Sequence, residues 1–316
     1  GMTYKEGILG IPKQFEYRPE VIGKDKIRPF KKIIVLGMGG SRLAGDVLNM
    51  VKPELDIHIH SDYDLPLLDA ETLRNSLIIA NSYSGNTVEP ISGAKMAIER
   101  GLNLVIITTG GELLTVAQEK QVPHVLLPHT ELPPRMMLGH DLMAMATLVG
   151  FDIGELTLCQ RIDAGVLKSE GSQIAQQIGS AIPLIYTSER LNQLGYIWKI
   201  ILNETAKIPA FHNELPEADH NEIAGFQKTQ IGQFHAIFLE NRLEHRIGQN
   251  MELTIELLEK NNIPVSETIL KGDSLSEQIV SSIILAHWVA LELATINNIE
   301  PLAILEIEDF KKKLQS

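Results

Sequence analysis

The ten residues KIIVLGMGGS, at positions 32–41, decide the fold of this chain. Lys32–Leu36 is a short apolar run rich in β-branched side chains, as is typical of a buried strand. A glycine turn and a helix-like segment follow, so the stretch predicts a strand, a turn and a helix. Similar units recur further along, and we expect strands at 57–60, 77–80, 104–107 and 122–127. Continuous apolar strands that alternate with helices predict a parallel sheet covered on both faces.

The second half of the chain repeats this plan. Strands are expected at 183–186, 236–239 and 264–267, and helices at 251–261, 275–297 and 303–314. The apolar pattern weakens near 150–154, so we place the domain boundary there and expect domains 1–152 and 153–316. The predicted fold class is α/β, with two doubly wound domains, each a mainly parallel sheet flanked by helices.

Composition sets limits on the function. The 316 residues are 44% hydrophobic, which is enough to fill two cores, and the net charge of −12 argues against nucleic acid or an anionic membrane as the main partner. The single Cys159 excludes an intramolecular disulfide and suits a reducing compartment. No apolar run approaches the ~20 residues of a membrane span and no signal-peptide core is visible, so we expect a cytoplasmic protein.

Two loops at predicted strand ends carry glycines and hydroxyls. Ligands of doubly wound sheets bind beyond the carboxyl ends of the strands, where helices begin. The loops GMGGS (37–41) and NSYSGNT (81–87) fall there and match neither GxGxxG nor a P-loop. Either loop alone could be a turn with a Ser/Thr helix cap. Together they predict a cradle for one phosphate, needing no metal, formed by Gly39, Gly40, Ser41, Ser82, Ser84 and Thr87.

The stretch 201–226, ILNETAKIPAFHNELPEADHNEIAGF, concentrates acid/base groups, among them Glu204 and His220. Its prolines and its lack of a 3.6-residue apolar stripe exclude one continuous surface helix. We interpret it as a helix that ends near Lys207, a polar loop, and a short helix near Asn221. Loops with this much titratable chemistry are more often functional sites than plain connections.

Two cationic positions need separate interpretation. Arg135 lies at the expected start of a helix, where a cation opposes the helix dipole at a cost of about 0.3–1 kcal/mol. That position favours a role in holding an anionic intermediate, with a surface salt bridge as the alternative. The run of Lys311, Lys312 and Lys313, taken alone, is the solvated end of the last helix. The histidines outside 201–226 lack metal-ligand spacing.

Together, GMGGS, SYSGNT, Pro134-Arg135, NETAK and PAFHNELPEADHNEIAGF resemble the bifunctional phosphoglucose/phosphomannose isomerases of the sugar isomerase (SIS) superfamily. The resemblance spans nearly the whole chain. It implies two SIS subdomains and a homodimer with active sites at the subunit interface. It also implies reversible aldose-ketose isomerisation of hexose 6-phosphates through a cis-enediolate, without cofactor or metal.

The resemblance also assigns roles to residues. Glu204 matches the catalytic base, Arg135 the arginine beside the intermediate, and His220 a ring-opening histidine that the neighbouring subunit supplies. Lys311 matches the lysine of the last helix, with Lys312 as the fallback. The two loops match the sites that bind the substrate phosphate.

The sequence departs from the family at two positions. Arg42 stands where a small residue is usual, and His140 where a tyrosine is common after the Pro-Arg pair. Arg42 could aid phosphate binding or crowd it, and His140 leaves the preference between glucose and mannose 6-phosphate open.

Three other functions compete with the isomerase interpretation. A non-catalytic sugar-phosphate-binding SIS regulator would keep the loops without needing Glu204, His220 or Lys311, and would usually bring a basic helix-turn-helix segment, which we do not find. A glutamine-dependent hexosamine phosphate synthase needs a further domain with an N-terminal cysteine. A purely structural dimerisation domain leaves the acid/base groups unexplained.

Overall fold

The computed structural model describes residues 1–227 and 232–315. The chain forms two compact units. Unit 1 consists of Gly1–Met2, Gly10–Arg161 and Ile304–Ser316, and unit 2 consists of Thr3–Leu9 and Ile162–Ala303. Thr3–Leu9 near the N-terminus thus groups with the second half of the chain, and the C-terminal segment from Ile304 groups with the first half. The division into domains 1–152 and 153–316 stays a prediction.

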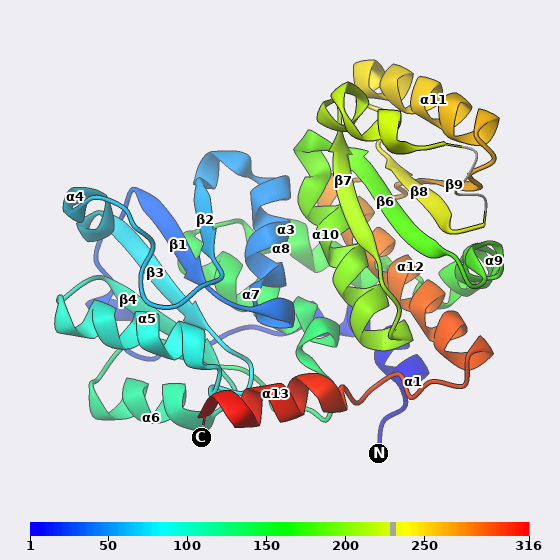
Figure 1. Cartoon of the computed structure of the whole chain (residues 1–316). Coiled ribbons are helices and arrows are strands. Elements are labelled where there is room, and N and C mark those ends of the chain that lie inside the picture. Colours follow the sequence, from blue (N-terminus) through cyan, green and yellow to red (C-terminus); the bar gives the residue numbers. More distant parts are fainter. Residues whose placement is uncertain (228–231, 316) are drawn as a thin grey trace. The chain divides into compact units, whose positions relative to one another are not determined.

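Unit 1 is built on a parallel sheet in the order β2-β1-β3-β4-β5 (Figure 1). Its strands are β1 Lys32–Leu36, β2 Ile57–His60, β3 Ser76–Asn81, β4 Leu104–Thr108 and β5 His124–Leu126. Its helices are α2 Ile11–Gln14, α3 Leu43–Val51, α4 Ala70–Arg74, α5 Val88–Glu99, α6 Gly111–Glu119, α7 Leu138–Val149, α8 Ile153–Thr157 and α13 Leu305–Gln315.

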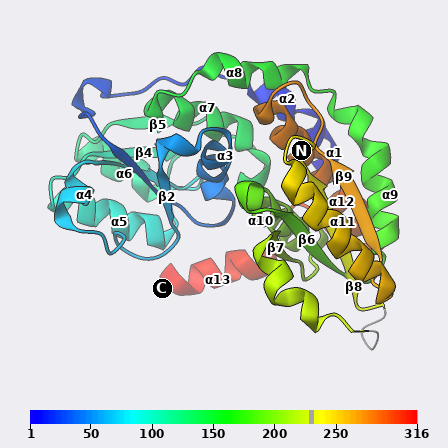
Figure 2. The same cartoon turned by 90° about the horizontal axis from the view of Figure 1, so that it is seen from above.

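Alternate side chains of these strands pack on opposite faces of the sheet, as the two-residue period of a strand requires. Ile34, Ile78 and Ile106 belong to a core shared with α4, α5 and α6. On the other face α3 packs closely on β1 and α7. A Cβ added at Gly45 of α3 would lie only 3.4 Å from Val35 Cγ2 of β1 and 3.7 Å from Met145 Sδ of α7. Both faces are thus covered, which explains why the strands are apolar without alternation (Figure 2).

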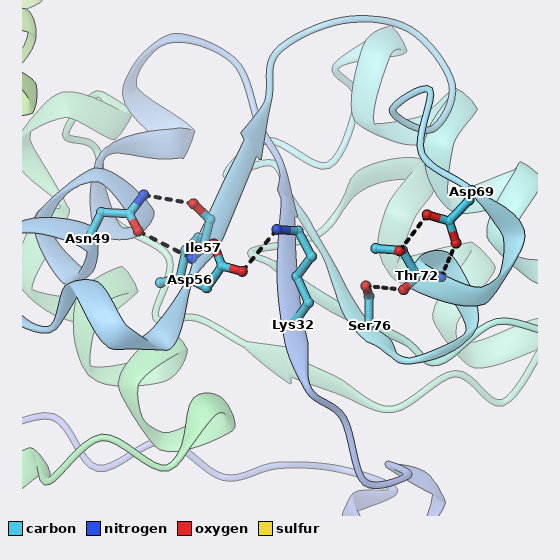
Figure 3. Close-up of polar contacts among 7 residues, drawn as sticks. All are labelled: Lys32, Asn49, Asp56, Ile57, Asp69, Thr72 and Ser76. Carbon is cyan, nitrogen blue, oxygen red and sulfur yellow. Dashed lines mark hydrogen bonds and ion pairs between the residues drawn. The ribbon is translucent and has the colours of Figure 1, made fainter.

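Side-chain hydrogen bonds fasten the elements around the start of this sheet (Figure 3). Asn49 of α3 bonds both backbone groups of Ile57, at 2.9 and 3.3 Å. Lys32 pairs with Asp56 at 3.1 Å. Asp69 caps α4 by accepting from the backbone and the hydroxyl of Thr72, at 2.8 and 2.7 Å. These contacts leave the opposite, carboxyl edge of the sheet for the candidate site.

Unit 2 has a smaller parallel sheet in the order β7-β6-β8-β9. Its strands are β6 Ile182–Ser188, β7 Phe211–Leu215, β8 Phe234–Glu240 and β9 Val265–Ile269, and its helices are α1 Tyr4–Leu9, α9 Lys168–Ile178, α10 Asn192–Ile201, α11 His245–Lys260 and α12 Leu275–Ile296. Tyr186 and Phe238 stack at 5.1 Å in a core shared with α11. The predicted α/β class, two parallel sheets flanked by helices, is confirmed.

Helix α12 corrects one expectation. By length and composition it could span a membrane, although no such apolar run was expected from the sequence. Within the described residues, 78% of its most apolar window is buried. Because α12 packs against α9 and α10 inside unit 2, its apolarity is that of a core helix.

The clearest error of the secondary-structure prediction lies in the stretch 201–226. The helix end near Lys207 and the short helical turns near Asn221 are confirmed, but the expected loop between them contains strand β7. This strand lies at the edge of its sheet and is buried only at Leu215. The strand is held by backbone pairing with β6. Because its middle side chains are polar, the sequence shows no apolar pattern that would predict a strand here.

Candidate active site

The two predicted phosphate loops lie at neighbouring strand ends of unit 1. After β1 the chain enters a tight 3₁₀ turn, Gly39–Arg42, and β3 runs directly into loop 82–87. Ser41 is buried, and its Oγ accepts a hydrogen bond from the backbone N–H of Tyr83 at 3.1 Å. The serine chosen from the sequence as a phosphate ligand therefore also joins the two loops.

Loop 82–87 is ordered by its own hydroxyls. Ser82 Oγ lies 2.8 Å from Thr87 Oγ1 and accepts from the backbone N–H of Gly85 at 3.1 Å. Ser82 is buried, whereas Ser84 is exposed and Thr87 is half-buried. The accessible hydroxyls are therefore those of Ser84 and Thr87, and Ser82 holds the loop in shape. Phosphate binding at these residues stays a prediction.

Arg135 lies in the 3₁₀ turn Pro134–Met136, just before α7, and is only 1% exposed. This burial excludes the surface salt bridge considered as its alternative. A Cβ on Gly40 would lie 2.7 Å from the backbone nitrogen of Arg135, so the glycine is needed where the turn meets this segment. The first phosphate loop, the second loop and Arg135 form one packed arrangement within unit 1.

The helix that carries Lys311 also belongs to unit 1. Every described side chain of α13 is exposed, Lys311 included, and Lys313 pairs with Asp309 at 3.0 Å. Gln315 Nε2 donates to the backbone carbonyl of Asn86 at 2.7 Å, which brings α13 alongside loop 82–87. The structure thus groups the lysine run with the loops from which it is most distant in sequence.

Glu204 of unit 2 occupies an unusual backbone element. It sits half-buried in the π-helical turn Leu202–Ala206 that follows α10, and this turn ends at Lys207 in the left-handed conformation, with φ of 56°. Thr205 Oγ1 lies 2.7 Å from the hydroxyl of Tyr4, which fastens the turn to α1. Single π-turns occur frequently at functional sites, because they displace one side chain from the helical path.

His220 is exposed at the end of the 3₁₀ turn Glu217–His220. The preceding Asp219 holds this turn on α11, since its carboxylate accepts from Asn250 Nδ2 at 3.0 Å and from Thr254 Oγ1 at 2.6 Å. The turn is anchored on both sides of the histidine, because Glu222 is also fixed.

Glu222 is a positioning residue to which sequence reasoning gave no role. Its carboxylate accepts from the hydroxyl of Tyr186 at 2.5 Å and from Asn213 Nδ2 at 2.8 Å. Burial and the Glu222 carboxylate raise the pKa of Tyr186, which therefore stays a neutral donor. Only the polar Asn213 in the middle of β7 could have signalled this contact, and that strand was missed.

The corresponding edge of the second sheet is acidic. Ser188, at the end of β6, donates to Glu244 Oε2 at 2.8 Å. Burial and the carboxylates of Glu189, Glu222 and Glu217 raise the pKa of Glu214. Carboxylates thus stand where the first sheet offers hydroxyls and glycines, and they disfavour a second phosphate at this edge.

The departure at His140 gives a half-buried neutral ring. It meets Tyr17 edge-on, with ring centroids 5.2 Å apart, and burial lowers its pKa. Arg42, the other departure, is held by Asp46, whose carboxylate accepts from Nε at 2.9 Å and from Nη2 at 2.8 Å. Arg42 Nη1 also donates to Ser61 Oγ at 3.1 Å. Its guanidinium therefore fastens the segment after β2 to α3.

Replacing Arg42 by methionine is expected to destabilise the protein by about 3 kcal/mol, because it removes the bonds that compensate the buried Asp46 carboxylate. The double variant Arg42→Met/Asp46→Leu should recover most of this loss, since it leaves no unpaired charge. Urea unfolding measures both. Equal losses in the single and double variants would contradict this role.

A buried carboxyl lies behind the second loop and escaped the sequence reasoning. Asp141, in the first turn of α7, is 7% exposed, and both of its oxygens lie 2.8 Å from the side-chain nitrogen of Asn81. Burial raises its pKa to about 7, although the Asn81 bonds oppose the shift. An apolar helix face gave no reason to expect an acid in the core.

Replacing Asp141 by asparagine is expected to stabilise the protein at pH 8 by about 2 kcal/mol more than at pH 5. The raised folded pKa means that the native state binds this proton more tightly than the unfolded state, so stability falls as the pH rises from about 4 to about 7. The amide never ionises and escapes that loss. Urea unfolding at both pH values measures the difference, and an equal effect at both would contradict it.

Comparison with known proteins identifies the relatives of this chain. Residues 167–314 match the family model described as the bacterial phospho-glucose isomerase C-terminal SIS domain. A bifunctional phosphoglucose/phosphomannose isomerase of Aquifex aeolicus is 31% identical over 323 residues, covering 98% of this chain and 97% of its own. A D-glucosamine-6-phosphate 4-epimerase of Sulfolobus acidocaldarius is 30% identical over 233 residues, covering 71% of this chain and 74% of its own.

Solved structures support the fold. The C-terminal domain of glucosamine-fructose-6-phosphate aminotransferase from Francisella tularensis superposes with a TM-score of 0.69 at 14% identity, covering 96% of this chain and 98% of that one. The family and the isomerase class predicted from the sequence are confirmed by the near-complete match to the Aquifex protein. On that match, the chain belongs to the bifunctional phosphoglucose/phosphomannose isomerase family.

Proposed function

We propose that this protein interconverts fructose 6-phosphate with glucose 6-phosphate, and with mannose 6-phosphate, by proton transfer through a cis-enediolate. The observation that carries the proposal is the arrangement in unit 1. There two glycine and hydroxyl loops are joined by the Ser41–Tyr83 hydrogen bond and packed against the buried Arg135. Such a preformed cradle suits an anionic group whose position must be fixed before chemistry.

Glu204 serves as the base in this proposal. It removes the proton from the second carbon of the open-chain aldose and returns it to the first carbon, while the hydroxyl proton on the second carbon's oxygen moves to the oxygen of the first. One carbon is reduced as its neighbour is oxidised, so no external oxidant is required. A well-placed base contributes about 100- to 10,000-fold in rate. Arg135 stabilises the enediolate charge, a role worth about 3 kcal/mol.

His220 and Lys311 open the sugar ring before isomerisation. A histidine suits proton exchange between the ring oxygen and the anomeric hydroxyl at neutral pH. We further propose a homodimer in which His220 serves the neighbouring subunit's site. The exposure of His220 and of the apolar side chains of α13, such as Phe310 at 64% exposed, supports an assembly that covers them. Lys311 remains preferred over Lys312.

Two other functions make different predictions. A non-catalytic sugar-phosphate-binding regulator would bind hexose phosphates without turnover. A 4-epimerase acting on a hexosamine phosphate, as the name of the Sulfolobus relative states for that protein, would change the configuration at the fourth carbon only.

The test is an assay of the purified protein with fructose 6-phosphate, in which glucose and mannose 6-phosphates are separated and quantified. The proposal predicts both products. Binding without turnover would favour the regulator, and a product altered at the fourth carbon would favour the epimerase. The relative yields of the two aldoses measure the preference that Arg42 and His140 left open. We expect the enzyme to act in the cytoplasm.

A further inference from the structure

The Asn81–Asp141 pair connects the two segments that carry the candidate anion site. Asn81 is the last residue of β3 and leads directly into loop 82–87. Asp141 lies in the first turn of α7, the helix that follows the Arg135 turn. Both side chains are buried, at 1% and 7% exposed, and the Asn81 amide nitrogen lies 2.8 Å from both Asp141 oxygens.

Packing alone does not explain this pair. Asn81 continues the series Leu77 and Ile79, whose side chains share one face of β3, and its neighbours on that face are apolar. Burying a carboxyl and an amide there costs more than burying two apolar groups of similar size, unless every polar atom is bonded. Asn81 Oδ1 has no hydrogen-bond partner within the described residues, so that cost is not fully offset.

The pair can bond in either protonation state of the carboxyl. With Asp141 ionised, the amide N–H group of Asn81 donates to it, as observed. With Asp141 protonated, its O–H needs an acceptor, and a half-turn of the Asn81 amide presents Oδ1 to it. Both states keep a direct link between the end of β3 and α7.

We propose that the Asn81–Asp141 pair is a positioning element of the anion site, which holds the start of loop 82–87 against the helix behind Arg135. The inference rests on the proposed function, because it assigns loop 82–87 to the substrate phosphate. Neither residue touches the reacting atoms in this proposal, so their loss acts through the placement of the loop.

The location of Asp141 makes anion binding depend on pH. A bound dianion disfavours ionisation of a nearby buried carboxyl, so affinity falls as the pH rises through the pKa of Asp141. The groups around Asp141 differ in their effect. Its charge raises the pKa of Tyr17 and of Tyr83, both of which stay neutral in this pH range. Burial lowers the pKa of the adjacent His140, so that ring is neutral as well.

The experiment compares Asp141→Leu and Asp141→Asn with the wild type and with Asn103→Leu. Asn103 is a matched control, because it is a buried asparagine just before β4 in the same unit, at the opposite edge of the sheet. Its side chain bonds the backbone of Arg28, at 2.8 and 3.0 Å. Steady-state kinetics with fructose 6-phosphate give KM and kcat, and titration calorimetry with sulfate gives anion affinity without a titrating ligand.

Asp141→Leu is expected to raise KM by about tenfold with kcat changed less than about threefold, as fits the loss of a buried hydrogen bond that acts on binding. Asn103→Leu should lose stability and keep KM. In the wild type, sulfate affinity should fall several-fold more between pH 6 and pH 8.5 than in Asp141→Asn. This comparison stays informative if Asp141→Leu does not fold, because asparagine keeps one hydrogen bond.

Two results would overturn the inference: a wild-type KM in Asp141→Leu, or the same pH dependence of sulfate binding in Asp141→Asn and in the wild type. Failure of the proposed function is distinguishable, because it would appear as no turnover of any hexose phosphate by the wild type. Sulfate binding with the expected pH dependence would then still support the role of the pair in an anion site.

Discussion

Replacing Glu204 by glutamine is expected to lower kcat for fructose 6-phosphate about 1,000-fold, with KM changed by less than about threefold. The amide keeps the size and hydrogen-bonding capacity of the carboxylate but cannot accept the proton. Because Glu204 lies in a π-helical turn braced by the Thr205–Tyr4 contact, the substitution should leave the backbone in place.

A matched control is Glu256→Gln, which removes an exposed carboxylate of α11 in the same unit. This variant should keep wild-type kinetics. Circular dichroism and urea unfolding should show both variants folded. Turnover by Glu204→Gln within tenfold of the wild type would remove Glu204 from the mechanism and leave the acid/base role to another carboxylate of the stretch 201–226.

Replacing Gly85 by alanine is expected to destabilise the protein by about 2–4 kcal/mol and to raise KM at least tenfold. Gly85 has φ of 76°, and a Cβ there would lie 1.8 Å from the carbonyl oxygen of Gly110. The clash is with backbone, so loop 82–87 must move. Since Ser84 and Thr87 flank this glycine, the accessible hydroxyls move with it.

Gly101→Ala separates backbone strain from the clash. Gly101 has a similar φ of 63°, but a Cβ added at this position would have no atom within 4 Å, so only the cost of the left-handed conformation applies. That cost is about 1–2 kcal/mol, without an effect on KM. Urea unfolding and steady-state kinetics compare the two variants. If Gly85→Ala behaved like Gly101→Ala in both, loop 82–87 would not depend on this close approach.

The fold was largely predictable because its buried strands carry a strong signal. Lys32–Leu36 and the run within β4 are apolar on both faces, which only a covered parallel sheet requires. The elements that escaped prediction are those whose stability comes from backbone pairing or tertiary contacts. Strand β7 is an edge strand with polar side chains, and α4 is short and held by its Asp69 cap.

The site residues were predictable as chemical types but not as an arrangement. Arg135 and Lys311 are far in sequence from the loops 37–41 and 82–87. Only the folded structure shows that the Arg135 turn packs against Gly40 and that α13 contacts Asn86. The partners of Arg42 and the buried Asp141 could not be predicted, since a carboxyl in an apolar helix face has no periodic signature. Residues whose role is to position others are the least visible from sequence.

The central claim, proton transfer at the second carbon of a hexose 6-phosphate, is tested most directly by incubating fructose 6-phosphate with the protein in D₂O and following the products by NMR. The account predicts glucose 6-phosphate and mannose 6-phosphate that carry deuterium at the second carbon in the fraction of turnovers in which the proton held by Glu204 exchanges with solvent before it is returned. It also predicts that Glu204→Gln forms neither product at a comparable rate. No aldose product, or a product altered only at the fourth carbon, would contradict it.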